Sequence, residues 1–320
     1  MQKVLGLFCG GFSSEYEISL KSAATIKQHF PNSYKVYRIL VKKESWQVEI
    51  ENTLVDFDLN TGSFLENGER VHLDLALVYT HGDPGENGKI QAYLDMKEIP
   101  YLNSNVLAST LSFDKWYCNQ FLKNFEIPVA KSVRLIKGES FNFQEIAKDL
   151  GFPMFVKPTD SGSSYGISKV KNLEEIEPAI EVAFKEGRTV VIESFLKGRE
   201  ITCGVYKTKT GIQALPLTEI VTENEFFDFS AKYEGKSREI TPAPIEQEHA
   251  SKIQGLAIKI YELLQLNSIA RIDFMLVGDV PHVIEVNTTP GFSPASIVPQ
   301  MIAASGKTIT EFWQEILDAQ

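Results

Sequence analysis

Apolar residues in this chain form short continuous runs that alternate with longer stretches in which they recur every three or four positions. The first run, residues 3–9, predicts a buried strand, and Gly10 and Gly11 after it predict a tight turn. Residues 14–29 then predict a helix that begins with a capping box formed by Ser14 and Glu17. The alternation continues with apolar runs at 34–41 and 73–79, a helix at 89–97 and an apolar stretch at 99–102.

This alternation is typical of a parallel sheet, and it predicts a first α/β domain over residues 1–103. Residues 104–190 have shorter strands, which favour a small antiparallel sheet with helices on one face. In the third block, 191–320, residues 222–240 lack periodicity and are long enough to form a functional loop or lid. The helices expected in these two blocks are 114–125, 143–150, 173–185, 246–264 and 308–317, and the strands are 132–135, 153–157, 167–170, 189–193, 200–206, 213–220 and a hairpin over 271–287.

The expected hairpin presents oxygen-bearing side chains on both of its strands, with its turn at residues 278–281. Val283, Glu285 and Asn287 alternate with an apolar row, so they share one face of the second strand, and the register sets Asp273 opposite Glu285 or Asn287. Three hard oxygen donors favour Mg²⁺ over zinc, which prefers His or Cys ligands. A polar hairpin edge without a metal is the alternative interpretation.

Composition narrows the classes of function. The chain has 320 residues, 43% of them hydrophobic, which is enough for several packed cores. Its 42 acidic and 32 basic residues give a net charge of -10, which argues against nucleic acid as a partner. Three separated cysteines suggest neither a disulfide framework nor a zinc site, and no apolar stretch is long enough for a membrane span. We therefore expect an unprocessed, soluble protein of a reducing cytoplasm, with no membrane partner.

A serine- and glycine-rich segment follows Lys157 at the end of a predicted strand. Backbone N–H groups and hydroxyls of residues 158–166 can surround phosphate oxygens, although the segment is neither a Walker A nor a GxGxxG sequence. On motif strength alone, a hairpin without a ligand is the favoured interpretation of this segment. Such a loop, followed roughly 100 residues later by carboxylates with magnesium spacing, is the order of parts in an ATP-grasp enzyme.

Seven short segments, taken in order, make the chain resemble the D-alanine:D-alanine ligase family. They are residues 10–20, 81–88, 113–115, 155–158 with the serine loop after it, 231–233, 271–273 and 285–291. The resemblance implies an α/β fold with a Rossmann-like N-terminal domain and two ATP-grasp subdomains that clamp the nucleotide. It also implies ATP-driven joining of two D-alanines for peptidoglycan, a requirement for Mg²⁺, for which Mn²⁺ can substitute, and a homodimer.

The same resemblance assigns residues to the first D-alanine, which donates the acyl group. Glu15 would bind its ammonium group, through a carboxylate held by hydrogen bonds that involve Ser163 and Tyr233, and His81 would lie nearby. From the sequence alone, Glu15 in the first turn of a helix could serve only the helix dipole, and a loop histidine could simply be solvated.

Other residues are assigned to the acceptor, the second D-alanine. Arg271 and the Gly291 N–H would stabilise the oxyanion, and Ser296 would bind the acceptor carboxylate. Tyr233 favours an amine acceptor, because relatives that accept D-lactate tend to lack this tyrosine.

A third group is assigned to ATP and its metal. Lys115 and Lys157 would contact the phosphates, and Lys232 would reach the transferring phosphoryl group, although each could be a surface lysine. Many family members have lysine where this chain has Ser194, but main-chain recognition of adenine makes the departure minor. The adenine linker would be Glu193, Ser194, Phe195 and Leu196, with Glu200 on the ribose, and the metal ligands would be Asp273, Glu285 and Asn287.

Two rival functions remain open from the sequence. An ATP-grasp ligase for D-lactate or another acceptor would keep the lysines and metal ligands but have no use for Glu15 with Tyr233. An ATP-binding regulator without turnover is less favoured, because Arg271, Asn287 and Glu15 are all retained.

Overall fold

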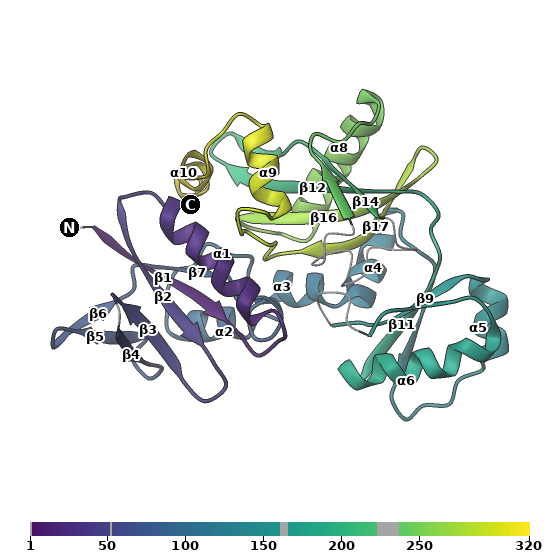
Figure 1. Cartoon of the computed structure of the whole chain (residues 1–320), viewed down its shortest axis with the longest axis horizontal. Coiled ribbons are helices and arrows are strands. Elements are labelled where there is room, and N and C mark those ends of the chain that lie inside the picture. Colours follow the sequence, from purple (N-terminus) through teal and green to yellow (C-terminus); the bar gives the residue numbers. More distant parts are fainter. Residues whose placement is uncertain (1, 52, 161–165, 223–236) are drawn as a thin grey trace.

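The computed structural model of the chain describes residues 2–51, 53–160, 166–222 and 237–320 (Figure 1). Within these residues, three β-sheets follow one another along the chain, and helices pack on each of them. The first sheet lies at one end of the molecule in Figure 1, the second at the other end, and the third between and above them. Across the described ranges no helix is both long and apolar enough to cross a membrane.

The first sheet has a parallel centre, as the apolar runs predict. β1 (Lys3–Gly10) pairs in parallel with β2 (Tyr34–Val41) and with β7 (Leu75–Val78). Leu5 and Leu7 of β1 share a core with α1 (Tyr16–His29), whereas Phe8 shares the opposite core with α2 (Lys89–Met96). Burial on both faces explains why these strands are continuously apolar.

Four antiparallel strands extend this sheet, and the sequence did not predict them. β3 (Trp46–Ile50), β4 (Thr53–Asp58), β5 (Ser63–Glu66) and β6 (Glu69–His72) add to the edge of β2, in the order β6-β5-β4-β3-β2-β1-β7. They are short and largely half-exposed or exposed, so they lack the apolar runs on which the prediction depended. The expected apolar stretch at 99–102 forms only an isolated parallel bridge between Ala76 and Tyr101.

The predicted capping box at the start of α1 is wrong. The helix begins at Tyr16, and Glu15 occupies the N-cap position without a side-chain capping bond. The hydroxyl of Ser13 instead accepts a hydrogen bond from the Glu15 N–H at 3.3 Å and donates to the His81 carbonyl at 2.9 Å. Ser13 thereby ties the start of the helix to the loop after β7.

The second sheet is small and wholly antiparallel, as predicted, with strand order β10-β9-β11-β8. Helices α5 and α6 share one apolar core with it. The helix expected at 114–125 is α4, and an unpredicted helix, α3, precedes it. The bounds are α3 (Val106–Phe113), α4 (Lys115–Lys123), β8 (Ser132–Ile136), α5 (Phe143–Leu150), β9 (Met154–Pro158), β10 (Ser168–Val170), η1 (Leu173–Glu175), α6 (Ile176–Glu186) and β11 (Thr189–Ser194).

The third sheet contains the predicted hairpin and has strand order β15-β14-β12-β16-β17, with β13 also paired to β12. The strand expected at 213–220 is divided into β13 and β14, and α9 is an unpredicted helix. The bounds are β12 (Arg199–Thr208), β13 (Gly211–Ala214), β14 (Thr218–Thr222), β15 (Ser237–Ile240), α8 (Gln247–Leu263), β16 (Ile269–Val277), β17 (Val280–Asn287), α9 (Ile297–Ala304) and α10 (Ile309–Asp318).

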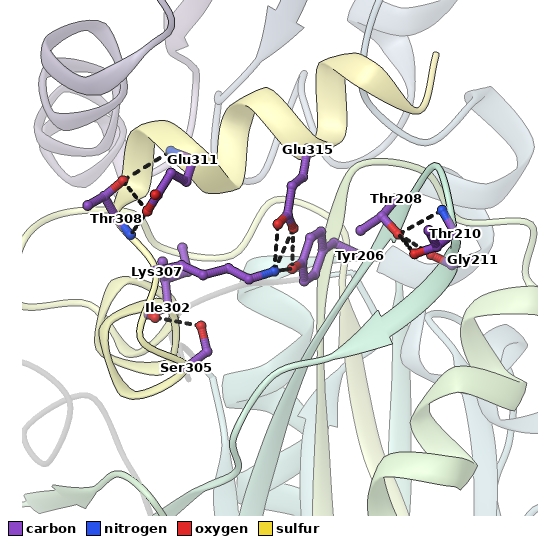
Figure 2. Close-up of polar contacts among 10 residues, drawn as sticks. All are labelled: Tyr206, Thr208, Thr210, Gly211, Ile302, Ser305, Lys307, Thr308, Glu311 and Glu315. Carbon is purple, nitrogen blue, oxygen red and sulfur yellow. Dashed lines mark hydrogen bonds and ion pairs between the residues drawn. The ribbon is translucent and has the colours of Figure 1, made fainter.

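The last helix, α10, is fixed to the third sheet by polar contacts and to the first sheet by apolar ones. Figure 2 shows Lys307 between Tyr206 of β12 and Glu315 of α10, with its ammonium 2.7 and 2.8 Å from the two Glu315 oxygens and 2.8 Å from the tyrosine hydroxyl. Phe312 and Trp313 of the same helix are completely buried in the core that contains Leu5 and Leu7. The two ends of the chain therefore share one core.

Candidate active site

The β16–β17 hairpin brings the predicted metal ligands onto neighbouring strands. Asp273 lies opposite Glu285 and Arg271 opposite Asn287, which resolves the register left open by the sequence. Val277 pairs directly with Val280, so the turn consists of Gly278 and Asp279 and is shorter than the expected segment 278–281.

A β-bulge in β17 corrects the predicted face of Val283. The register moves from Asp273 opposite Glu285 to Phe274 opposite Val283, which leaves Ile284 as an extra residue in β17. Val283 and Val286 are both buried in the same apolar core, so Val283 does not share a face with Glu285. Before the bulge, odd-numbered positions of β17 face the core, and after it even-numbered positions do. Glu285 and Asn287 therefore lie on the polar side of the strand.

The Asp273 carboxylate is surrounded by donors. Arg271 binds it through two parallel hydrogen bonds of 2.8 Å, Asn287 donates its amide at 3.1 Å, and Thr202 of β12 donates its hydroxyl. Burial acts against the charged form of Arg271, but the adjacent Asp273 carboxylate outweighs it and holds the pKa of the guanidinium above its ordinary value. Glu200 lies two residues before Thr202 on the same face of β12.

Two lysines from different elements form ion pairs with carboxylates near the hairpin, and the pair of Lys157 is buried. The ammonium of Lys115, the first residue of α4, lies 3.6 Å from Glu285, and that of Lys157 on β9 lies 2.7 Å from Glu193 on β11. Asn119 also donates to Glu193, at 3.3 Å. Because the Lys115 N–H donates to the Thr159 carbonyl at 2.9 Å, the two lysines belong to one hydrogen-bonded region between the second and third sheets.

The loop after β7 brings buried titratable groups close to Glu15. His81 is only 4% exposed and lies 3.3 Å from the Ser22 hydroxyl, and burial lowers its pKa despite the opposing effect of the Glu15 carboxylate. A side chain at Gly82 would come within 3.8 Å of a Glu15 carboxylate oxygen, so Glu15 lies against this loop.

Glu86 is a buried carboxyl group that the sequence did not single out. It accepts a hydrogen bond of 2.8 Å from the Gly82 N–H, and burial, with repulsion from Glu15 and Glu285, raises its pKa to about 8. Its position within the 81–88 segment was the available signal, but a glutamate in a loop gives no hint of burial.

Gly291 and Ser296 lie together on the loop between β17 and α9. A side chain on Gly291 would come within 3.1 Å of the Ser296 hydroxyl. That hydroxyl accepts a hydrogen bond from the Ser293 N–H at 3.0 Å and lies 2.8 Å from the Ser293 hydroxyl. Ser296 occupies the N-cap position of α9 without capping it, and it is therefore held by the loop and not by the helix.

Family models and sequence relatives identify the family of this chain. Models described as D-ala D-ala ligase N-terminus and C-terminus match residues 4–104 and 121–318 respectively. The chain belongs to the D-alanine–D-alanine ligase family. It is 43% identical to the D-alanine–D-alanine ligase of Parabacteroides distasonis and 41% identical to that of Phocaeicola vulgatus; each alignment covers 99% of this chain, and 97% and 99% of the relative.

Solved structures agree with this assignment to the family. D-alanyl-alanine synthetase A of Vibrio cholerae is 31% identical, with a TM-score of 0.88 over 100% of this chain and 99% of that one. The VanG D-Ala:D-Ser ligase of Enterococcus faecalis is 28% identical, with a TM-score of 0.87 over 99% of both chains. These similarities confirm the predicted α/β ATP-grasp fold class, whereas the boundaries at residues 103 and 190 stay predictions.

The segment predicted to bind adenine lies at the end of β11 and just beyond it. Ser194 donates its N–H to the Lys131 carbonyl at 2.9 Å, and Phe195 donates its N–H to the Pro153 carbonyl at 3.3 Å. Main-chain recognition of a purine would therefore use other groups of this segment, such as those of Leu196. The family roles expected for Ser163, Lys232 and Tyr233, and most of the proposed lid, fall on residues 161–165 and 223–236, outside the described residues.

The donor set of the hairpin fits Mg²⁺ in chemical type. In the described part of the chain no three His, Cys, Asp or Glu side chains group closely enough to hold a metal ion, so a metal bound here would need Asn287 as a third protein ligand. The Asn287 amide NH₂ donates to Asp273, which makes the amide oxygen the atom suited to a cation. Both carboxylates also have a cationic neighbour, Arg271 for Asp273 and Lys115 for Glu285.

Proposed function

We propose that this protein joins two D-alanines to D-alanyl-D-alanine at the expense of ATP, through a D-alanyl phosphate, and so supplies a precursor of peptidoglycan. One observation supports this most strongly: the paired strands β16 and β17 present Asp273, Glu285, Arg271 and Asn287 together in a chain that aligns over 99% of its length with relatives named D-alanine–D-alanine ligase. We propose the same division into domains and the same site residues as the sequence predicts.

In the first step, a carboxylate oxygen of the donor attacks the γ-phosphorus of ATP, and the bond from that phosphorus to ADP breaks. Glu15 would bind the donor ammonium beside the Gly82 loop. The neutral His81, buried against Ser22, would shape this pocket without adding charge. Lys115 and Lys157 would offset the repulsion between the donor carboxylate and the phosphates.

Mg²⁺, when bound by Asp273, Glu285 and Asn287, would neutralise charge on the ATP phosphates. Lys115, the first residue of α4, and Lys157, near the end of β9, would add positive charge beside the same phosphates. A strand-borne pair of carboxylates is well suited to this role, because cross-strand neighbours are fixed at short separation by the ladder.

In the second step, the neutral amine of the acceptor attacks the acyl carbon. The bond from carbon to the phosphate oxygen breaks, inorganic phosphate leaves, and the new amide nitrogen loses a proton. Arg271, whose guanidinium is fixed by two bonds to Asp273, and the Gly291 N–H would stabilise the developing oxyanion. Ser296 would hold the acceptor carboxylate next to Gly291.

We further propose that Mn²⁺ can replace Mg²⁺, that the protein acts as a homodimer, and that it works in the cytoplasm without a nucleic acid or membrane partner. The buried free cysteines support a cytoplasmic location, and the excess of acidic over basic residues supports the absence of a nucleic acid partner.

Mass spectrometry of the products tests the function directly. The protein is incubated with ATP, Mg²⁺ and an equal mixture of D-alanine, D-lactate and D-serine. D-alanyl-D-alanine with stoichiometric ADP and phosphate is expected as the main product. A dominant mixed product would assign another acceptor, and ATP binding without ADP formation would instead identify a regulator.

A further inference from the structure

A single glutamine side chain connects an edge of the third sheet to the loop between β17 and α9. Gln300 lies in the first turn of α9, and its Nε2 donates to the Glu239 carboxylate at 2.7 Å and to the Ala295 carbonyl at 3.1 Å. Glu239 belongs to β15, the last strand in the order of the sheet, which among the described residues pairs with β14. The two bonds use the same amide group, so they set the distance between β15 and residue 295.

Ala295 immediately precedes Ser296, whose hydroxyl is held by Ser293. The acceptor loop, defined here as residues 291–296, is therefore fastened at both sides of the Ser296 hydroxyl. Ser293 holds the Ser296 hydroxyl through hydrogen bonds within the loop. Gln300 holds the Ala295 carbonyl through its Nε2, and the same Nε2 is bonded to Glu239 on β15.

Glu239 makes a strong anchor because it is half-buried and charged. Burial raises the pKa of its carboxyl group, whereas the bond from Gln300 and the positive charge of Arg271 act in the opposite direction. The carboxylate therefore lies in the electrostatic field of the guanidinium that would stabilise the acyl oxyanion. Hydrogen bonds to a charged acceptor are stronger than those between neutral groups.

We propose that Gln300 is a positioning residue for the acceptor substrate, anchored by Glu239, and that it holds Ser296 where the acceptor carboxylate binds. This inference rests on the proposed function, since it assumes that Ser296 binds the acceptor. It assigns no contact between Gln300 and either substrate. Loss of the link should therefore weaken acceptor binding and leave formation of the acylphosphate intact.

The test separates the two halves of the reaction. Hydroxylamine, a nucleophile without a carboxylate, attacks the acylphosphate and releases phosphate and the hydroxamate of D-alanine, which reports the donor half. Initial rates over a wide range of D-alanine concentration give separate donor and acceptor KM values. In Gln300→Met, the acceptor KM is expected to rise about tenfold, while hydroxamate formation and the donor KM stay at their wild-type values.

Matched variants at Glu239 supply the controls. Glu239→Gln keeps an oxygen acceptor for Gln300 and should change the acceptor KM by less than about twofold, whereas Glu239→Leu should match Gln300→Met. The double variant Glu239→Leu with Gln300→Met should be no worse than either single variant, because both remove the same link. Melting temperatures identify any variant that fails to fold, and Glu239→Leu then replaces Gln300→Met.

An unchanged acceptor KM in Gln300→Met would overturn the proposal, as would an equal loss of hydroxamate formation, which would indicate a general structural role. A wild-type protein that forms no hydroxamate with D-alanine would instead refute the proposed function itself. The two failures therefore give different results.

Discussion

The buried ion pair between Lys157 and Glu193 can be broken from one side at a time. Their side chains are 8% and 9% exposed and their charged atoms lie 2.7 Å apart, on adjacent antiparallel strands of the second sheet. Lys157→Met removes the cation but nearly preserves the volume and the apolar stem. It leaves the Glu193 carboxylate buried, where the Asn119 amide still donates to it at 3.3 Å.

The expected cost follows from this geometry. Removing one partner of a buried ion pair destabilises a protein by about 3–5 kcal/mol, mainly because the other charge stays desolvated. We expect a loss near the lower end, about 3 kcal/mol, since Asn119 still donates to Glu193. Adding Glu193→Gln to Lys157→Met removes the stranded charge, so the double variant should regain about 2 kcal/mol.

Urea unfolding followed by circular dichroism measures these changes. The ion pair between Lys131 and Asp149 provides a control, because its side chains are 57% and 50% exposed, and Lys131→Met should cost less than about 0.5 kcal/mol. A loss below about 1 kcal/mol in Lys157→Met, or a double variant in which the two losses simply add, would refute the reasoning.

Three further predictions concern the site and the shared core. Glu285→Gln should lower phosphate release by about 10²–10³-fold while circular dichroism stays unchanged, and near-normal turnover would remove the metal assignment. Burial raises the pKa of Glu86 from 4.5 to about 8, so between these pH values the folded state keeps a proton that the unfolded chain loses. The free energy of unfolding should therefore fall as pH rises from 4.5 to 8. Urea titrations should show a smaller fall in Glu86→Gln. Trp313→Ala should cost about 3–5 kcal/mol in the same assay, and a loss under about 1 kcal/mol would contradict its place in the core.

The sequence predicted those elements whose burial leaves a strong pattern. The parallel strands of the first sheet are buried on both faces and therefore continuously apolar, and the antiparallel second sheet followed from its short strands. Strands β3–β6 were missed because they are short and partly exposed. Helix α9 was missed because its eight residues, Ile297–Ala304, are almost all apolar and include Pro299, so no helical period is visible.

The sequence predicted candidate site residues but not the partners of each. The resemblance assigned Lys157 to the phosphates and Glu193 to the adenine linker. The structure pairs the two side chains, because β9 and β11 are neighbouring strands. The bulge at Ile284 depends on how β17 meets β16, which is a tertiary property. Glu86 was missed because only the folded loop reveals that its carboxyl group is buried. The roles expected of Ser163, Lys232 and Tyr233 stay predictions.

The core shared by both ends of the chain has a consequence for synthesis on the ribosome. Phe30, the residue that follows α1, contacts the ring of Trp313 at 5.7 Å between centroids, and Leu5 and Leu7 belong to the same core. A nascent chain can form β1 and α1 early, but part of their apolar face stays exposed to water until α10 has left the exit tunnel. The amino-terminal segment should therefore become protease-resistant only after α10 has emerged, and a truncation just before α10 should leave that segment open to digestion.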